Sequence, residues 1–316
     1  LILTEDAIYA ARDKYGRTPI VLGRNGSGHV AAFESSSFAN LGYERVRDLA
    51  PGEMVRLTED SIETVLAGGT KNQICSFLWV YYGYPSSYYE GINVEASRYR
   101  CGQALAHEDM KDTEADCVAG IPDSGVGHAI GYSNEKKLPY ARPFVKYTPT
   151  WPRSFMPQNQ SMRDLVAKMK LIPNKELTQG KRIIFLDDSI VRGTQLKDNI
   201  VKLYESGIKE MHIRIASPPL IFPCVFLNFS ASRSLYDLYT RRVIRDLEGG
   251  VEVLSDEVLA QYVNPDSEKY KNMVEAMRKH MGVTSLKFQR LDSLVKSIGL
   301  PKESICTHCF DNSSVM

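Results

Sequence analysis

The sequence given lacks three features that would assign it to a broad class of protein: an excess of charge, a long apolar run and a secretory-signal pattern in its first residues. Its 39 Lys and Arg residues nearly balance its 38 Asp and Glu residues, and the formal net charge of +1 gives no basic surface for nucleic acid. No apolar run approaches the length that spans a bilayer, and the first residues lack the pattern of a secretory signal. These absences predict a cytoplasmic protein that binds neither nucleic acid nor a membrane.

Cysteine is too scarce for a disulfide scaffold. The 316 residues include six cysteines without an export signal, which predicts reduced thiols. Cys306 and Cys309 form a Cys-x-x-Cys pair, a spacing typical of metal ligands, but one pair supplies only half of a four-coordinate site. Without Cys75 and Cys224, a frayed tail that carries two idle thiols would be the better interpretation of the pair. Cys101 and Cys117 lie within apolar patterns and are expected to be small core residues.

Two kinds of secondary structure divide the chain. Up to about residue 69 the sequence has short β-rich runs, with a hairpin turn expected at Arg-Asn-Gly-Ser-Gly (24–28). Beyond Thr70, strands alternate with helical patterns, which favours βαβ units and a parallel sheet. Two domains, 1–69 and 70–316, are therefore predicted, the second in the α/β class.

Three strand-like segments are expected in the second part: 116–121, 182–188 and 210–217. A helix should follow the second strand, with Leu196, Ile200, Leu203 and Tyr204 on one side. The Pro-rich and aromatic segment 139–164 is too long for a simple connector and is expected to act as a lid. From Arg241 onward the sequence predicts mainly helices.

Two adjacent carboxylates, Asp187 and Asp188, follow the second strand. Neighbouring negative charges repel each other, so a buried strand end keeps both ionised only where Mg²⁺ or sugar hydroxyls meet them. The six residues behind them, 189–194, would present backbone N–H groups at a helix start, with Gly193 allowing close approach to a phosphate. Together the two features predict a site for a ribose 5-phosphate. In isolation, Asp187 would be read as a surface turn residue and Asp188 as a helix N-cap.

The string Asp-Asp-Ser-Ile-Val-Arg-Gly-Thr resembles the phosphoribosylpyrophosphate (PRPP) signature of type I phosphoribosyltransferases, in the form found in amidophosphoribosyltransferases. Further segments agree in order and spacing. Residues 120–125 resemble the pyrophosphate loop of that family, residues 153–163 its Arg-Thr-Phe lid, and residues 45–55 the end of its glutaminase domain. The resemblance implies a parallel phosphoribosyltransferase sheet flanked by helices, preceded by part of a β-rich glutaminase domain of the N-terminal nucleophile type.

Family members pass ammonia from glutamine to C1 of PRPP, which yields 5-phosphoribosylamine and pyrophosphate in the first step of purine (IMP) biosynthesis. Carried over by position, the catalytic residues would be Asp187 and Asp188, which bind ribose and Mg²⁺, and Lys146 and Arg153, which neutralise the departing pyrophosphate. Ser124 would join the metal shell. A solvated loop lysine is an equally good interpretation of Lys146. The residues expected to bind PRPP are Ser189, Ile190, Val191, Arg192, Gly193, Thr194, Asp123, Ser124 and Gly125.

The glutaminase reaction of the family uses an N-terminal cysteine as its nucleophile. This chain begins with Leu1, and the resemblance covers only the distal half of that domain, so we expect a cut end and no glutamine hydrolysis by the chain as it stands.

Some family members hold a [4Fe–4S] cluster on four cysteines, and all four positions are matched here. The resemblance therefore assigns cluster ligation to Cys75, Cys224, Cys306 and Cys309; thiolate chemistry alone would equally allow structural zinc.

Two other functions remain open. A salvage-type phosphoribosyltransferase would share the acidic loop but lack the β-rich front and the four cysteines. A non-catalytic PRPP-binding regulator would retain the ligand site alone. The resemblance further implies a homo-oligomer, dimeric or tetrameric, with PRPP and glutamine or ammonia as small-molecule partners.

Overall fold

The computed structural model describes residues 1–109, 113–146, 171–227 and 234–313, except for the side chains of residues 194 and 195. The chain forms two compact units. One comprises Leu1–Arg98, Cys224–Phe229 and Asp292–Met316, and the other comprises Tyr99–Pro223 and Ser230–Leu291. The predicted domains 1–69 and 70–316 are defined differently, by where a glutaminase-like segment is expected to end. That division stays a prediction.

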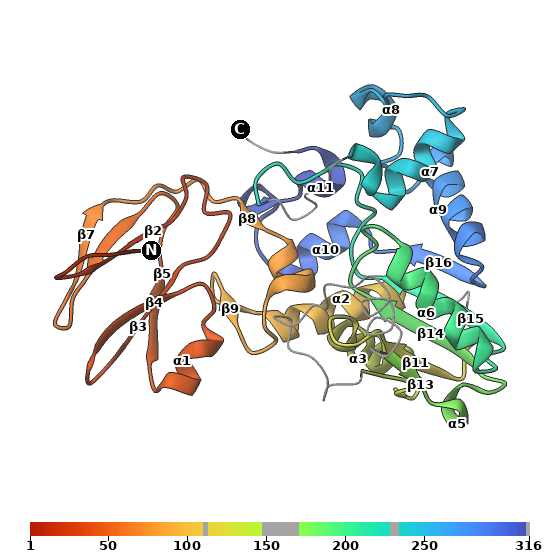
Figure 1. The fold of residues 1–316 in the computed structure, drawn as a ribbon, viewed down its shortest axis with the longest axis horizontal. Coiled ribbons are helices and arrows are strands. Elements are labelled where there is room, and N and C mark those ends of the chain that lie inside the picture. Colours follow the sequence, from red (N-terminus) through yellow and green to blue (C-terminus); the bar gives the residue numbers. More distant parts are fainter. Residues whose placement is uncertain (110–112, 147–170, 228–233, 314–316) are drawn as a thin grey trace, which may run out of the picture. The chain divides into compact units, whose positions relative to one another are not determined.

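The first unit contains two antiparallel sheets, drawn in red and orange in Figure 1. One has the strand order β1 (Ile2–Leu3), β2 (Ile8–Ala11), β6 (Met54–Leu57), β7 (Ile62–Leu66). The other has the order β4 (Gly28–Ala32), β3 (Val21–Asn25), β5 (Glu44–Asp48). Asn25 pairs with Gly28 across a two-residue turn, which confirms the predicted hairpin. Inward-facing residues of both sheets form one apolar cluster: Ala10, Ile20, Leu22, Leu49, Val55 and Leu57.

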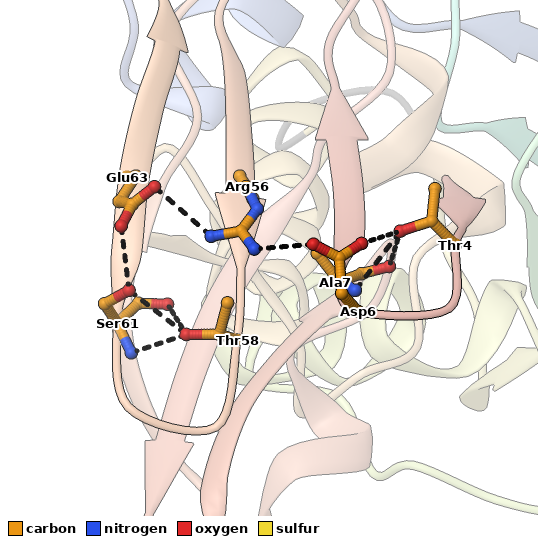
Figure 2. Close-up of polar contacts among 7 residues, drawn as sticks. All are labelled: Thr4, Asp6, Ala7, Arg56, Thr58, Ser61 and Glu63. Atoms are coloured by element: carbon orange, nitrogen blue, oxygen red, sulfur yellow. Dashed lines mark hydrogen bonds and ion pairs between the residues drawn. The ribbon is translucent and has the colours of Figure 1, made fainter.

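The outer surface of the first sheet carries a polar network around Arg56 (Figure 2). The Arg56 guanidinium donates to Asp6 at 2.9 Å and to Glu63 at 3.4 Å, linking the turn before β2 to strand β7. Thr58 and Ser61 close the turn between β6 and β7 through hydroxyl contacts. The two carboxylates are exposed to solvent and the Arg56 side chain is partly exposed, so these ion pairs contribute little to stability and mainly keep this sheet face polar.

The remaining elements of the first unit come from two parts of the sequence, residues 36–93 and residues 291–311. They are α1 (Ser36–Leu41), β8 (Ile74–Cys75), the π-helix η1 (Leu78–Tyr82), β9 (Tyr88–Tyr89), β10 (Ile92–Asn93), α10 (Leu291–Ile298), η3 (Lys302–Ser304), β17 (Ile305–Cys306) and α11 (His308–Asp311). Strand β17 pairs in parallel with β8, so that Cys306 lies opposite Cys75. Helix α2 (Val94–Glu108) runs from this unit into the next.

The second unit is built on a four-stranded parallel sheet, as predicted for the α/β class (Figure 1). Its strands, in spatial order, are β11 (Cys117–Gly120), β14 (Arg182–Asp187), β15 (Glu210–Ile215) and β16 (Ser285–Phe288). The two middle strands, β14 and β15, are buried along nearly their whole length, as expected of a parallel sheet with helices on both faces. Helices α3 (Gly125–Lys136) and α6 (Thr194–Glu205) follow β11 and β14, and Leu196, Ile200 and Leu203 of α6 are buried as predicted.

The region after Arg241 departs from the prediction in one element. Helices α7 (Tyr239–Leu247), α8 (Asp256–Ala260) and α9 (Glu268–Met281) are present, but β16 interrupts the helical stretch and pairs with β15. Its four residues alternate between buried and partly exposed, too short a pattern to distinguish from a loop. The expected lid is only partly described. Strand β12 (Phe144–Lys146) pairs with β13 (Leu171–Pro173), ahead of α5 (Lys175–Thr178), and residues 147–164 of the segment lie outside the described residues.

A buried charged network packs against the parallel sheet. Asp109 and Arg214 have fully buried side chains, and the Arg214 Nε atom donates to the carboxylate at 2.6 Å. Lys287 donates to the same carboxylate at 2.7 Å and Tyr132 at 2.5 Å. Burial by itself would raise the pKa of Asp109, but the Arg214 charge and these hydrogen bonds hold it well below its usual range. Asp109 is therefore ionised, and its charge is balanced within the unit.

Within the part of the chain that is described, no helix is both long enough and apolar enough to cross a bilayer.

Candidate functional site

The two predicted carboxylates lie at the carboxyl edge of the parallel sheet. Asp187 is the last residue of β14, which lies between β11 and β15. The backbone continues the ladder past the strand end, because Ala216 N–H donates to Asp187 O at 2.9 Å and Ser217 N–H donates to Asp188 O at 3.0 Å. The acidic pair is thus held by a rigid strand end, the position where open α/β sheets bind ligands.

Asp188 connects two loops. Its Oδ1 accepts a hydrogen bond of 2.6 Å from Ser124, and its Oδ2 accepts one of 2.6 Å from Ser189. The residue is only 7% exposed. Helix α6 has Gly193 as its N-cap, so the simpler interpretation of Asp188 as a helix cap is wrong. Asp188 instead ties the loop after β11 to the loop after β14.

Asp187 carries an unfavourable charge in this arrangement. Burial raises its pKa well above the usual range, and the neighbouring Asp188 carboxylate raises it further. Its Oδ1 accepts only the adjacent Asp188 N–H among the hydrogen bonds of the described residues, at 3.0 Å. A cation or hydroxyl donors at this strand end would therefore stabilise the ionised form.

The first loop, 121–125, is packed directly onto the strand end. Ile121 N–H donates to Leu186 O at 2.8 Å, Ser124 precedes helix α3, and the peptide bond from Pro122 to Asp123 is cis. A Cβ atom on Gly125 would lie 2.3 Å from Leu186 O and 3.3 Å from the Cα of Asp187. Glycine at this position lets the start of α3 approach the acidic pair closely.

We expect Gly125→Ala to destabilise the second unit by about 1–3 kcal/mol, because backbone atoms must move apart to admit the methyl group. Unfolding in denaturant, followed by far-UV circular dichroism, would measure the change in the free energy of unfolding. Gly26→Ala is the matched control, since a Cβ atom there meets nothing within 4 Å. Equal stability of the two variants would contradict the close approach.

Lys146 reaches the first loop from the end of β12. Its Nζ atom forms an ion pair with the Asp123 carboxylate, and both side chains are largely exposed. The predicted lysine is thus brought to the rim of the acidic site, where a surface pair of this kind is weak and easily exchanged for another anion. Arg153, the other predicted lid cation, lies outside the described residues.

The second loop, 189–193, is supported by helix α7. Val191 O accepts the Tyr239 N–H at 2.8 Å, and Arg192 O accepts Arg242 Nη2 at 2.6 Å. Gly193 has φ +76°, and a Cβ atom there would lie 3.0 Å from the Tyr239 ring. Tyr239 and Arg242 could not be identified from the sequence, because no local signal connects them with a loop nearly fifty residues away. Thr194 begins helix α6, and its side chain is not described.

The acidic site offers few protein ligands for a metal ion. Among the described residues, no three His, Cys, Asp or Glu side chains stand where they could hold one ion. The site therefore supplies two adjacent carboxylates and the hydroxyl of Ser124, and the other ligands of an ion would have to come from a substrate or from water. Such a sparse set suits Mg²⁺, which keeps several waters and commonly binds through one or two carboxylates and substrate phosphates.

The four predicted cluster cysteines line a single cavity of the first unit. Cys75, Cys306 and Cys309 are buried, each 8% exposed, and Cys224 is partly buried. The other residues that line the cavity are Arg17, Ser76, Phe77, Phe226, Leu227 and His308. Leu227 N–H donates to the Cys224 sulfur at 3.3 Å. Cys101 and Cys117 are also buried but lie in the second unit, as small core residues should.

The four thiols influence one another across this cavity. Burial raises the pKa of Cys75 to about 12, with further increases from Cys306 and Cys224. A hydrogen bond with Cys224 raises the pKa of Cys309 well above its usual range, and burial adds to the rise. The metal-free site therefore holds protonated thiols, and a metal ion would have to displace their protons.

Comparison with known proteins gives one consistent result. No protein-family model matches the chain. The chain is 34% identical over 310 residues to amidophosphoribosyltransferase of Mycobacterium bovis, covering 98% of this chain and 53% of that protein. It is 31% identical over 311 residues to amidophosphoribosyltransferase of Bacillus subtilis, covering 98% and 58%. The chain thus spans little more than half the length of these curated relatives.

Solved structures agree with this result. Glutamine phosphoribosylpyrophosphate amidotransferase of Bacillus subtilis, complexed with ADP and GMP, superimposes with a TM-score of 0.77 at 29% identity, covering 98% of this chain and 62% of that one. A structure described as the allosteric regulatory enzyme of purine biosynthesis gives a TM-score of 0.79 at 29% identity, covering 98% and 61%.

Proposed function

We propose, on the premise that this chain is a homologue of the amidophosphoribosyltransferases over 98% of its length, that it transfers the phosphoribosyl group of PRPP to ammonia. The products would be 5-phosphoribosylamine and pyrophosphate, the first step of purine (IMP) biosynthesis. In a longer protein with the missing part of the glutaminase domain, glutamine would supply the ammonia. The proposed domains are 1–69, the distal glutaminase segment, and 70–316, the transferase.

One observation carries this proposal: Asp188 hydrogen-bonds both Ser124 and Ser189 and so joins the two loops that would hold the two ends of PRPP. Loop 189–194 would bind the 5-phosphate through backbone N–H groups at the start of α6. Loop 121–125 would bind the pyrophosphate. The acidic pair between them would orient the ribose hydroxyls, so that C1 faces the incoming ammonia.

The chemistry at C1 calls for positioning and charge stabilisation. The bond from C1 to pyrophosphate breaks as the bond to the ammonia nitrogen forms, and the nitrogen then releases a proton to solvent. The Asp187 and Asp188 carboxylates would stabilise the positive charge that develops on the ribose ring. Lys146 would leave Asp123 to meet the departing pyrophosphate, and Arg153 would assist it. When bound by Asp187, Asp188 and Ser124, Mg²⁺ would supply charge neutralisation for the pyrophosphate oxygens.

The test is ammonia-dependent release of pyrophosphate from PRPP in the presence of Mg²⁺. Release with ammonia but not with nucleobases supports the proposal. Release with a nucleobase would identify a salvage-type enzyme instead. Tight binding of Mg²⁺ and PRPP without turnover would identify a non-catalytic regulator.

We propose further that the cysteine cavity holds a [4Fe–4S] cluster through Cys75, Cys224, Cys306 and Cys309. Support comes from the donor set: four cysteines line one cavity that is otherwise lined mainly by aromatic and apolar groups. As described, no three of their sulfur atoms stand where they could hold one ion. The side chains would rotate about their Cα–Cβ bonds to complete the coordination. The cluster would hold three separate chain segments together and thereby stabilise the first unit.

Cys309→Ser should lose most of its iron and acid-labile sulfide, because a hydroxyl is a poor ligand for this cluster. Anaerobic expression followed by iron and sulfide analysis would measure the loss. Cys101→Ser serves as the matched control, being a buried cysteine outside the cavity. Full iron content in the Cys309 variant would remove the proposed ligand set.

The family resemblance also supports the proposal that the protein is cytoplasmic and forms a homo-oligomer, either a dimer or a tetramer. Analytical ultracentrifugation would test the oligomeric state.

A further inference from the structure

A single arginine, Arg17, contacts the cysteine cavity from the β-rich part of the first unit. It is only 7% exposed, and it lines the cavity together with Cys75, Cys224, Cys306 and Cys309. Its carbonyl oxygen accepts the Cys75 N–H at 3.1 Å. Its guanidinium faces Cys306, where its charge and a hydrogen bond oppose the rise in the pKa of that thiol caused by burial. The sequence analysis gave Arg17 no role.

Aromatic rings fix the position of this guanidinium. Its Cζ atom lies 3.6 Å from the centroid of the Phe226 ring and 4.8 Å from that of Tyr15. The Arg17 Nη2 atom also donates to Gln73 Oε1 at 3.5 Å. Phe226 follows Cys224 by two residues, and Gln73 precedes Cys75 by two. Together with Cys306, the arginine therefore contacts all three segments that carry the four cysteines. Two rings hold the planar cation beside the sulfur atoms instead of letting it turn to solvent.

The positive charge of Arg17 would oppose the net negative charge of a metal ion or cluster bound by four thiolates in this cavity. Four thiolates bring more negative charge than an oxidised iron–sulfur core, or a zinc ion, cancels. In a buried cavity such an excess is costly unless a nearby cation compensates for it. Among the residues that line the cavity, Arg17 is the one with a permanent positive charge.

We propose that Arg17 is a positioning residue that compensates the negative charge of the four-cysteine metal site and so increases its affinity for metal. This inference rests on the proposed metal site but not on the kind of metal. Residues around a metal site that are not themselves ligands commonly alter affinity by about 10–100-fold, and we expect an effect of that size here.

A purely structural role is the rival explanation. Arg17 could act only by filling the space between the Tyr15 and Phe226 rings. Arg17→Lys keeps the charge but loses the planar stack, whereas Arg17→Gln keeps a polar side chain without the charge. Arg56→Gln is a control for loss of an arginine elsewhere in the same unit, since Arg56 lies on β6 among exposed partners (Figure 2).

The test measures metal retention and not turnover. The wild type and the three variants are prepared anaerobically, and the loss of iron to a chelator is followed in each. A parallel titration of the metal-free proteins with Cd²⁺, followed by thiolate-to-metal absorption, reports on the same four sulfurs without requiring iron. We expect Arg17→Gln to release metal about 10–100-fold more readily, Arg17→Lys to be much closer to the wild type, and Arg56→Gln to match it.

The outcomes bear on two proposals, the iron–sulfur cluster and the charge role of Arg17. Unchanged iron and Cd²⁺ retention in Arg17→Gln would overturn the role of Arg17 and leave the cluster intact. Equal losses of metal in Arg17→Lys and Arg17→Gln would show that the stacking of the guanidinium on the rings is responsible. That result would also overturn the proposed role of the Arg17 charge. A wild type without iron, whose Cd²⁺ affinity still falls in Arg17→Gln, would reject the cluster and keep the charge role. A wild type that binds neither metal would reject both.

Discussion

Asp188→Asn should lower kcat/KM for ammonia-dependent pyrophosphate release by about 10²–10³-fold, the loss usually seen when one group that stabilises transition-state charge is removed. The change removes a charge that would face the ribose and Mg²⁺. It also disturbs the bridge between the two loops, because an amide nitrogen replaces one of the oxygens that now accept hydrogen bonds from Ser124 and Ser189. Steady-state release of pyrophosphate at saturating Mg²⁺ would measure the loss.

The control for this prediction is Asp198→Asn, which removes a carboxylate from the exposed side of α6, close in sequence but outside the loop. That variant should retain the wild-type rate. Wild-type turnover by the Asp188 variant would mean that the acidic pair has no part in the reaction, and the proposed function would lose the observation that carries it.

Asp109→Ala should destabilise the second unit by about 3–5 kcal/mol, because it leaves the Arg214 guanidinium buried without a counter-charge. Lys287 and Tyr132 lose a partner in the same change. Equilibrium unfolding in urea, followed by far-UV circular dichroism, would measure the difference. Glu275→Ala removes an exposed carboxylate that pairs with Arg278 on α9, and it should change stability little.

The pH dependence of stability offers a second measurement on Asp109. Its pKa is lower in the folded protein than the value near 4 expected of the unfolded chain, so its contribution is complete above about pH 4. As the pH falls below that value towards the folded pKa, the contribution is progressively lost. The difference in stability between wild type and Asp109→Asn should therefore shrink in acid. A constant difference across this range would indicate that Asp109 is not ionised in the folded state.

Much of the second unit could be predicted from the sequence, because the signals there are local. The apolar run before Asp187 predicts a buried parallel strand, and the structure has β14 at Arg182–Asp187. The amphipathic spacing of Leu196, Ile200 and Leu203 predicts helix α6 and its buried face. The roles assigned to the loop residues and cysteines remain predictions, although the structure brings Ser124 to Asp188, Lys146 to Asp123 and the four cysteines to one cavity.

Contacts between distant segments could not be predicted in this way. Strand β16 is identified by its pairing with β15 and not by a pattern of its own. Tyr239 supports loop 189–193 through a backbone hydrogen bond to Val191, which any residue except proline could donate. Arg17 reaches the cysteine cavity because of how the β-rich segment folds. From the sequence alone, such residues look like ordinary surface residues. Their neighbours are determined by tertiary packing, which no local pattern predicts.

The cysteine cavity is assembled from three distant stretches of chain, the last of which contains Cys306 and Cys309. During translation Cys75 leaves the ribosome long before these two, and β8 has no β17 to pair with until the end of the chain appears. Any ion that needs all four sulfurs can therefore enter only after synthesis of this region is finished. Under the proposed ligand set, a chain that stops before Cys306 would lack two of the four sulfur atoms and would fail to receive the ion.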